Sequence, residues 1–330
     1  MTNRSGIRRS LTISSWRGCL TVAMIAALLL VTSPLCAGVP GDIPQTAPGG
    51  EHPWWIWPVI LLVVTFVMGI VAVLAGIGGG VLFVPLISSF FPFHLDFVRC
   101  AGLMVALTGA LAAGPGLLRM NLASLRLAVP MALIASASSI VGAVIGLSLP
   151  TPVVRTALGV AILAICVIMT ATKKSEYPPV PQMDRLASTL RICGIYREMS
   201  TDERIDWKAH RTPLGLFLFI LVGFCAGMFG LGAGWANVPV LNIVMGVPLK
   251  ISVATSKFLL SVTDTSAAWI YINRGCILPL IAIPSIVGIM LGSLVGVRLL
   301  TITRPFIIRW IVIAVLAFAG CKTLAMGLGF

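Results

Sequence analysis

Charge is scarce in this sequence. Of its 330 residues only 10% are charged and 58% are hydrophobic, whereas soluble domains contain about 25% charged residues. A chain this apolar cannot cover a water-facing surface, so the composition excludes an ordinary soluble enzyme. It predicts an all-α polytopic membrane protein whose apolar surface is solvated by lipid.

Acidic residues are scarcer than basic ones. The chain has 10 Asp and Glu against 23 Lys and Arg, which gives a net charge of +13. A basic soluble protein would suggest a nucleic-acid partner, but no basic stripe interleaved with aromatic residues occurs here. We therefore expect no nucleic-acid partner. The expected partner is the lipid bilayer, and the positive charge indicates loops on the cytoplasmic side.

Familiar catalytic and metal-binding motifs are also missing. The eight cysteines are scattered without a C-x-x-C pair, which excludes the usual zinc spacing and a disulfide framework. There is no H-E-x-x-H, and no G-x-S-x-G lies in a membrane segment with a histidine partner. We expect no metal, no cofactor and no enzymatic activity. One alternative stays open, an intramembrane enzyme that uses Lys257 with Ser261.

The N-terminus has the pattern of a targeting segment. Four arginines precede an apolar run over residues 18–31, which predicts a signal peptide or signal anchor over residues 1–37. A further transmembrane helix is the alternative. Residues 38–53 are rich in Gly and Pro and are predicted to form an extracytoplasmic linker.

Apolar stretches continue along the rest of the chain. They cover residues 54–76, 81–91, 97–118, 127–149, 154–172, 213–229, 235–246, 251–272, 277–300 and 305–326. Most can cross a hydrocarbon core of about 30 Å as helices, but 81–91 and 235–246 are too short, so we expect about 8–10 membrane segments. Residues 173–212 form a long polar stretch, which is predicted to be a cytoplasmic loop. This polar stretch separates a predicted membrane repeat over 54–172 from a second one over 213–330.

The two membrane parts share a motif. Gly76–Pro85 reads G-I-G-G-G-V-L-F-V-P, and Gly230–Pro239, 154 residues later, reads G-L-G-A-G-W-A-N-V-P. We interpret this match as an internal duplication. If the short segments cross the membrane, the repeats are inverted and most basic residues lie inside, as the positive-inside rule favours. If the short segments are re-entrant, the repeats are parallel.

Each shared motif predicts a broken helix. Several glycines in a row destabilise a helix by roughly 1 kcal/mol each relative to Ala. The half-length helix that follows offers free N–H groups and the positive end of its dipole, which suit an anion. Close helix packing is the alternative interpretation. The candidate substrate-binding residues in the breaks are Gly78, Gly79, Gly80, Gly232, Ala233 and Gly234.

Two charges fall inside the apolar stretch 251–272. Lys257 and Asp264 are seven residues apart and so share a helix face. Since a charge at mid-membrane is costly, such residues face a cavity or each other. Lys257 could attract an anion and Asp264 could carry a coupling proton, or the two could form a structural pair nearer the interface. Arg99 is expected to extend to the interface. Further candidate substrate-binding residues are Asn237, Thr255 and Ser256.

Together, the two glycine breaks, the Val-Pro that follows each and Ala254-Thr255-Ser256 resemble the sulfite exporter (TauE/SafE) family, also called the toluene-sulfonate uptake permease family. The resemblance covers residues 56–326. It implies a multi-pass carrier in the bacterial inner membrane for sulfur-containing or organic anions such as sulfite, sulfonates or sulfoacetate.

These features favour a secondary transporter that works by alternating access. Its substrate, a small anion, would bind between the two breaks. Because no ATP-binding motif is present, the expected driving force is an ion gradient, with a proton or another ion as coupling partner, or the substrate's own gradient. A thiosulfate or sulfur uptake carrier and an anion channel are the alternatives. The oligomeric state stays open, with a homo-oligomer among the options.

Overall fold

A computed structural model of the chain describes residues 55–75, 78–91, 93–119, 123–171, 183–190, 192–197, 204–299 and 305–329. The predicted targeting segment 1–37 and all of the predicted linker 38–53 lie outside these residues. Nearly all of both predicted membrane repeats lies within them.

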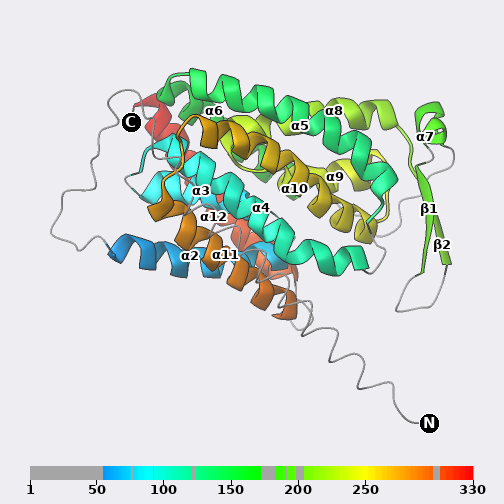
Figure 1. The fold of residues 1–330 in the computed structure, drawn as a ribbon, viewed down its shortest axis with the longest axis horizontal. Helices are drawn as coiled ribbons and strands as arrows, with labels where there is room; N and C mark the ends of the chain where they lie inside the picture. The colour runs from blue at the N-terminus through cyan, green and yellow to red at the C-terminus, as the bar shows by residue number, and fades with distance from the viewer. Residues whose placement is uncertain are drawn as a thin grey trace, which may run out of the picture. The chain divides into compact units, whose positions relative to one another are not determined.

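Helices dominate the described part of the chain (Figure 1). Before the polar stretch they are α2 (Ile56–Ala75), α3 (Gly79–Phe90), α4 (Leu95–Arg119), α5 (Leu125–Ser148) and α6 (Thr151–Ala171). After it they are α8 (Thr212–Phe229), α9 (Gly234–Pro239), the π-helical turn η1 (Val240–Val244), α10 (Leu249–Asn273), α11 (Pro279–Leu299) and α12 (Pro305–Leu328).

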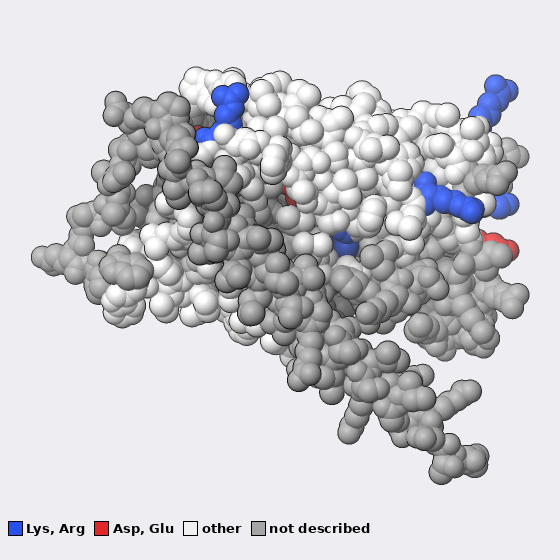
Figure 2. Space-filling model, in the orientation of Figure 1, with Lys and Arg blue, Asp and Glu red and all other residues white. Residues whose placement is uncertain are grey.

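Six of the described helices, α2, α4, α5, α6, α8 and α11, are long and apolar enough to cross a membrane. Helix α10 has 25 residues but includes three charged ones, Lys250, Lys257 and Asp264. Figure 2 shows a described surface that is mostly uncharged, with most charged atoms toward its left and right edges. The described part of the chain is thus mostly helical and has several helices able to span a membrane, as the prediction of an all-α polytopic membrane protein requires.

Two of the large helix pairs are parallel. Helices α2 and α11 run parallel, because Leu62 lies against Gly288 and Ile70 against Gly296. Helices α5 and α8 also run parallel, and there Gly223 contacts Ala135 while Gly227 contacts Ser139.

Two further pairs are antiparallel. In α6 and α12, Gly159 contacts Leu324 and Ile162 contacts Gly320. In α4 and α10, the guanidinium of Arg99 lies 5.2 Å from the ring centroid of Tyr271. Further along both helices, Ala106 and Asp264 approach the same glycine, Gly232.

The two short segments turn back toward the start of the helix that precedes each of them. Trp57 in the first turn of α2 lies 5.7 Å from Phe91, ring centroid to centroid, just after the end of α3. The N–H of His210, just before α8, donates to the carbonyl of Met245, just after η1, at 3.0 Å. Each short segment therefore runs opposite to its long partner.

The polar stretch 173–212, predicted as a loop, contains regular structure. It includes α7 (Arg185–Thr189) and an antiparallel hairpin of β1 (Cys193–Arg197) and β2 (Arg204–Lys208). Trp207 of β2 is 6% exposed and belongs to one hydrophobic cluster with Met245 and Val247. The stretch is thus partly folded against the end of η1; its cytoplasmic location stays a prediction.

Candidate functional site

The two glycine breaks meet in the structure. A methyl group placed on Gly234 would lie 3.0 Å from both the Cα and the N atom of Gly78, so the two backbones are in direct contact. Helix α3 begins one residue after Gly78, and α9 begins at Gly234. Residues far apart in sequence therefore form one junction at the first turns of two short helices.

Local geometry explains why these positions are glycine. Helix α8 ends where Gly230 takes a left-handed φ of 69°, and Gly232 has a φ of 71°. L-residues with a Cβ rarely adopt such angles, and a left-handed glycine is a common way to end a helix. A methyl group on Gly80 would lie 2.6 Å from the carbonyl oxygen of Leu231. Gly80 therefore also has the close-packing role that was the alternative for these glycines.

One face of α10 covers the junction. Leu260 contacts both Gly78 and Gly234, and the Asp264 carboxylate lies against Gly232. Lys257 precedes Leu260 by one turn on the same face and is partly exposed. The structure thus brings Asp264 and the predicted glycines together, with Lys257 two turns away from Asp264.

Polar groups beside the junction lack partners. Asn237 in α9 is 1% exposed, yet neither its amide nitrogen nor its amide oxygen has a hydrogen bond within the described part of the chain. Asp264 is fully buried, and the Ala233 N–H faces it, but neither carboxylate oxygen has a hydrogen bond of normal geometry. Each buried unpaired group costs about 1–3 kcal/mol. Such a concentration suits a ligand-binding place.

The remaining predicted residues are placed differently. Gly79 packs toward Ile289 and Val105. The Thr255 hydroxyl accepts a hydrogen bond from the N–H of Ser124 at 3.2 Å and so fixes the chain just before α5. Ser256 is buried next to Thr255. Substrate binding by these three residues stays a prediction.

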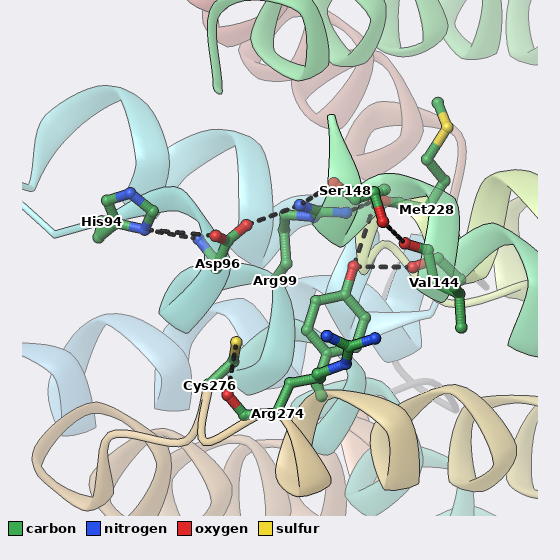
Figure 3. Close-up of polar contacts among 11 residues, drawn as sticks. His94, Asp96, Arg99, Val144, Ser148, Met228, Arg274 and Cys276 are labelled. Atoms are coloured by element: carbon green, nitrogen blue, oxygen red, sulfur yellow. Dashed lines mark hydrogen bonds and ion pairs between the residues drawn. The ribbon is translucent and has the colours of Figure 1, made fainter. Parts of the chain in front are cut away.

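A second polar cluster surrounds Arg99 (Figure 3). Its Nη1 donates to an Asp96 carboxylate oxygen at 2.7 Å and to the Gly146 carbonyl at 3.2 Å, and its Nη2 donates to the Met228 carbonyl. The Tyr271 hydroxyl donates to the carbonyls of Gly227 at 2.9 Å and Met228 at 3.3 Å. We call Asp96, Arg99 and Tyr271 the Arg99 cluster.

The prediction that Arg99 extends to the interface is wrong, because the residue is fully buried. The end of α8 supplies the reason. The last turn of a helix leaves carbonyls without N–H partners, and the break at Gly230 places two such carbonyls inside the bundle. Asp96, three residues before Arg99, was the available sequence signal for an internal ion pair.

Comparison with known proteins identifies the family. The family model described as Sulfite exporter TauE/SafE matches residues 60–323. A curated relative, "Probable membrane transporter protein YunE" of Bacillus subtilis (strain 168), is 26% identical over 136 residues, which are 41% of this chain and 50% of the relative. The chain thus spans about half the length of that relative. No solved structure matches. The chain belongs to the Sulfite exporter TauE/SafE family and is a multi-pass membrane protein.

Proposed function

We propose that the protein is a secondary transporter that moves a small sulfur-containing or organic anion, of the sulfite, sulfonate or sulfoacetate type, across the bacterial inner membrane. Family membership and the name of the curated relative support transport. The sequence carries no ATP-binding motif, so an ion gradient or the substrate's own gradient drives the movement.

The junction of the two breaks carries this proposal. It combines contact between Gly78 and Gly234 with the unpaired buried groups of Asn237 and Asp264. A small oxyanion bound here would accept hydrogen bonds from the Asn237 amide and from backbone N–H groups of the breaks. Lys257 would add positive charge at the partly exposed edge.

Asp264 would carry the coupling proton. An ionised carboxylate that is buried without a partner is costly, by several kcal/mol. A proton bound on Asp264 together with a substrate anion keeps the net charge of the loaded site low. A carboxylate beside the anion site therefore links the two bound species electrostatically.

Alternating access requires two halves that move against each other. In the proposed repeats α2 corresponds to α8, α5 to α11, α4 to α10 and α6 to α12. Exchanging the repeats therefore turns the parallel pair α2–α11 into the parallel pair α8–α5, and it leaves the antiparallel pairs α6–α12 and α4–α10 unchanged. This pattern supports inverted repeats related by an axis in the membrane plane, with the substrate between them. In this arrangement the stretch 173–212 is cytoplasmic and α4 begins at the extracytoplasmic side.

Uptake of sulfite into proteoliposomes tests the site. Gly232→Ala places a methyl group 2.8 Å from the Asp264 carboxylate at a φ of 71°, whereas Gly275→Ala has the same φ with nothing within 4 Å. We expect Gly232→Ala to reduce uptake at least about tenfold, because atoms misplaced by even 1 Å at a binding site have large effects. Gly275→Ala should retain uptake.

Lys257→Met provides a second arm, matched by Lys322→Met. Lys322 lies 4.1 Å from the Phe90 ring centroid, away from the junction. Uptake at the wild-type rate in both Gly232→Ala and Lys257→Met would refute the site. Uptake that does not saturate with sulfite and ignores a proton gradient would support the channel alternative instead.

A further inference from the structure

We propose that Arg99 is a gating residue that, with Asp96 and Tyr271, closes the transport path at the end of the bundle where α4 begins. The inference rests on the proposed transport function. It deepens that proposal by assigning one end of the path to a specific set of contacts.

The Arg99 cluster ties both halves of the chain together. Arg99 belongs to α4, and its guanidinium bonds the Gly146 carbonyl of α5 and the Met228 carbonyl of α8. It also stacks on Tyr271 of α10. Helix α4 packs with α11, the partner of α2, whereas α5 packs with both α8 and α10. A movement of α4 away from α5, α8 and α10 at this end must therefore break these contacts.

The cluster lies between the junction and the exposed start of α4. On the inner side, a methyl group on Gly230, the first residue of the break, would lie 2.4 Å from the Arg99 carbonyl oxygen. On the outer side, side-chain exposure rises from 1% at Arg99 to 28% at Asp96 and 56% at His94. A solute that enters from this end meets the cluster before it meets the junction.

The other half has no equivalent cluster in its sequence. With the 154-residue offset of the repeat, Asp96 corresponds to Lys250, Arg99 to Val253 and Tyr271 to Leu117. A polar tie of this composition is therefore specific to one end. The described structure has this polar tie formed.

Glycine at position 146 makes room for this tie. A methyl group there would lie 2.2 Å from the Arg99 Nη2 atom. Gly146→Ala therefore displaces the guanidinium without removing any polar group. Gly142→Ala is a control for helix packing, since a methyl group there would lie 2.2 Å from the Phe224 carbonyl oxygen and 3.1 Å from the Met228 nitrogen of α8, but none of the atoms nearest to it belongs to Arg99.

Native Cys100, next to Arg99, reports whether this end is open. It is fully buried in the described structure. The experiment measures its labelling by a membrane-impermeant maleimide, applied from either side to full-length protein in oriented vesicles, with the other seven cysteines changed to alanine. Because labelling without added sulfite needs no substrate, a failure of the proposed substrate would leave the comparison of the variants intact.

We expect Arg99→Met to speed Cys100 labelling at least about tenfold, because lost contacts shift the population toward the open form. Tyr271→Phe and Gly146→Ala should give smaller increases, all from the side where α4 begins. Gly142→Ala should speed labelling less than Gly146→Ala does, and Lys322→Met should leave the rate unchanged. Added sulfite should alter the rate in Tyr271→Phe, which a purely structural weakening would not produce.

Two results would overturn the proposal. One is unchanged labelling of Cys100 in both Tyr271→Phe and Gly146→Ala, variants that retain Arg99 if Arg99→Met fails to fold. The other is equal acceleration from both sides, or equal acceleration in Gly142→Ala, because either would indicate general loosening of the bundle.

Discussion

The junction and the Arg99 cluster lie close together along α8 and α10, yet they differ in how far their buried polar groups are paired. At the Arg99 cluster, Arg99 is paired with Asp96 and the carbonyls of Gly227 and Met228 in α8 accept hydrogen bonds, and only the Arg99 Nε lacks a partner among the described residues. At the junction, no side chain pairs with Asn237 or Asp264 in the described part of the chain, and Asp264 faces one backbone N–H, that of Ala233. Paired buried groups hold a structure in one state, whereas unpaired ones are costly until something binds. The comparison separates residues that hold the bundle from residues that would meet a substrate.

The largest expected effect is on the paired side of this comparison. Arg99→Met should lower the free energy of unfolding by about 3 kcal/mol, the lower end for breaking a buried ion pair, because Asp96 remains partly hydrated. Thermal unfolding in detergent measures this as a fall in Tm. A Tm equal to that of the wild type would show that the cluster contributes no stability.

Stabilisation of the protein by bound sulfite should depend on the junction and not on the Arg99 cluster. Sulfite at 100 times its Kd should stabilise the protein by about 2.7 kcal/mol, because it binds the folded chain alone. The Tm increase should persist in Tyr271→Phe and vanish in Asn237→Leu, as a thermal-shift series would show. Protection that survives Asn237→Leu would place the anion elsewhere, and a series with thiosulfate and sulfonates would rank the substrates.

Asp264→Asn should separate stability from transport. It keeps the volume of a buried carboxyl that no side chain neutralises and removes its charge, so the free energy of unfolding should rise by about 1–2 kcal/mol. Proton-coupled uptake should be lost at the same time. The pair of measurements is Tm in detergent and uptake under an imposed pH gradient; a lower Tm would reveal a partner for Asp264.

The smallest effect is expected at Thr255. Thr255→Val removes the acceptor for the Ser124 N–H and should cost about 0.5–1 kcal/mol, typical of polar contacts inside membrane bundles. If Thr255 only fixes the start of α5, the KM for sulfite should not change. A raised KM with little change in Tm would move Thr255 to the substrate side of the comparison.

Hydropathy predicted the helices well, because each must span an apolar layer by itself. The prediction 127–149 became Leu125–Ser148, and the short stretch 81–91 became Gly79–Phe90. The glycine breaks were also predicted, since their cost is local. Contact between Gly78 and Gly234 was not predicted, because it depends on how separate helices pack, and a single sequence does not show which helices are neighbours.

The burial of Arg99 and the presence of the hairpin were not predicted, for a related reason. An arginine near a segment end has two outcomes, water or an internal acceptor, and the choice depended on carbonyls more than a hundred residues away in α8. The strands Cys193–Arg197 and Arg204–Lys208 are short, and the charge of their stretch masked the burial of Trp207 in the hydrophobic cluster that includes Met245.

The pairing of α2 with α11 bears on how the chain is inserted during synthesis. Residues 76–278 must emerge from the ribosome before the partner of α2 exists, whereas α5 and α8 are separated by one helix and the polar stretch. Helix α2 must therefore be stable in the lipid bilayer without its partner until α11 has been synthesised. Its Thr65 donates to the Leu61 carbonyl of the same helix at 2.7 Å, so its one buried hydroxyl is satisfied before α11 arrives.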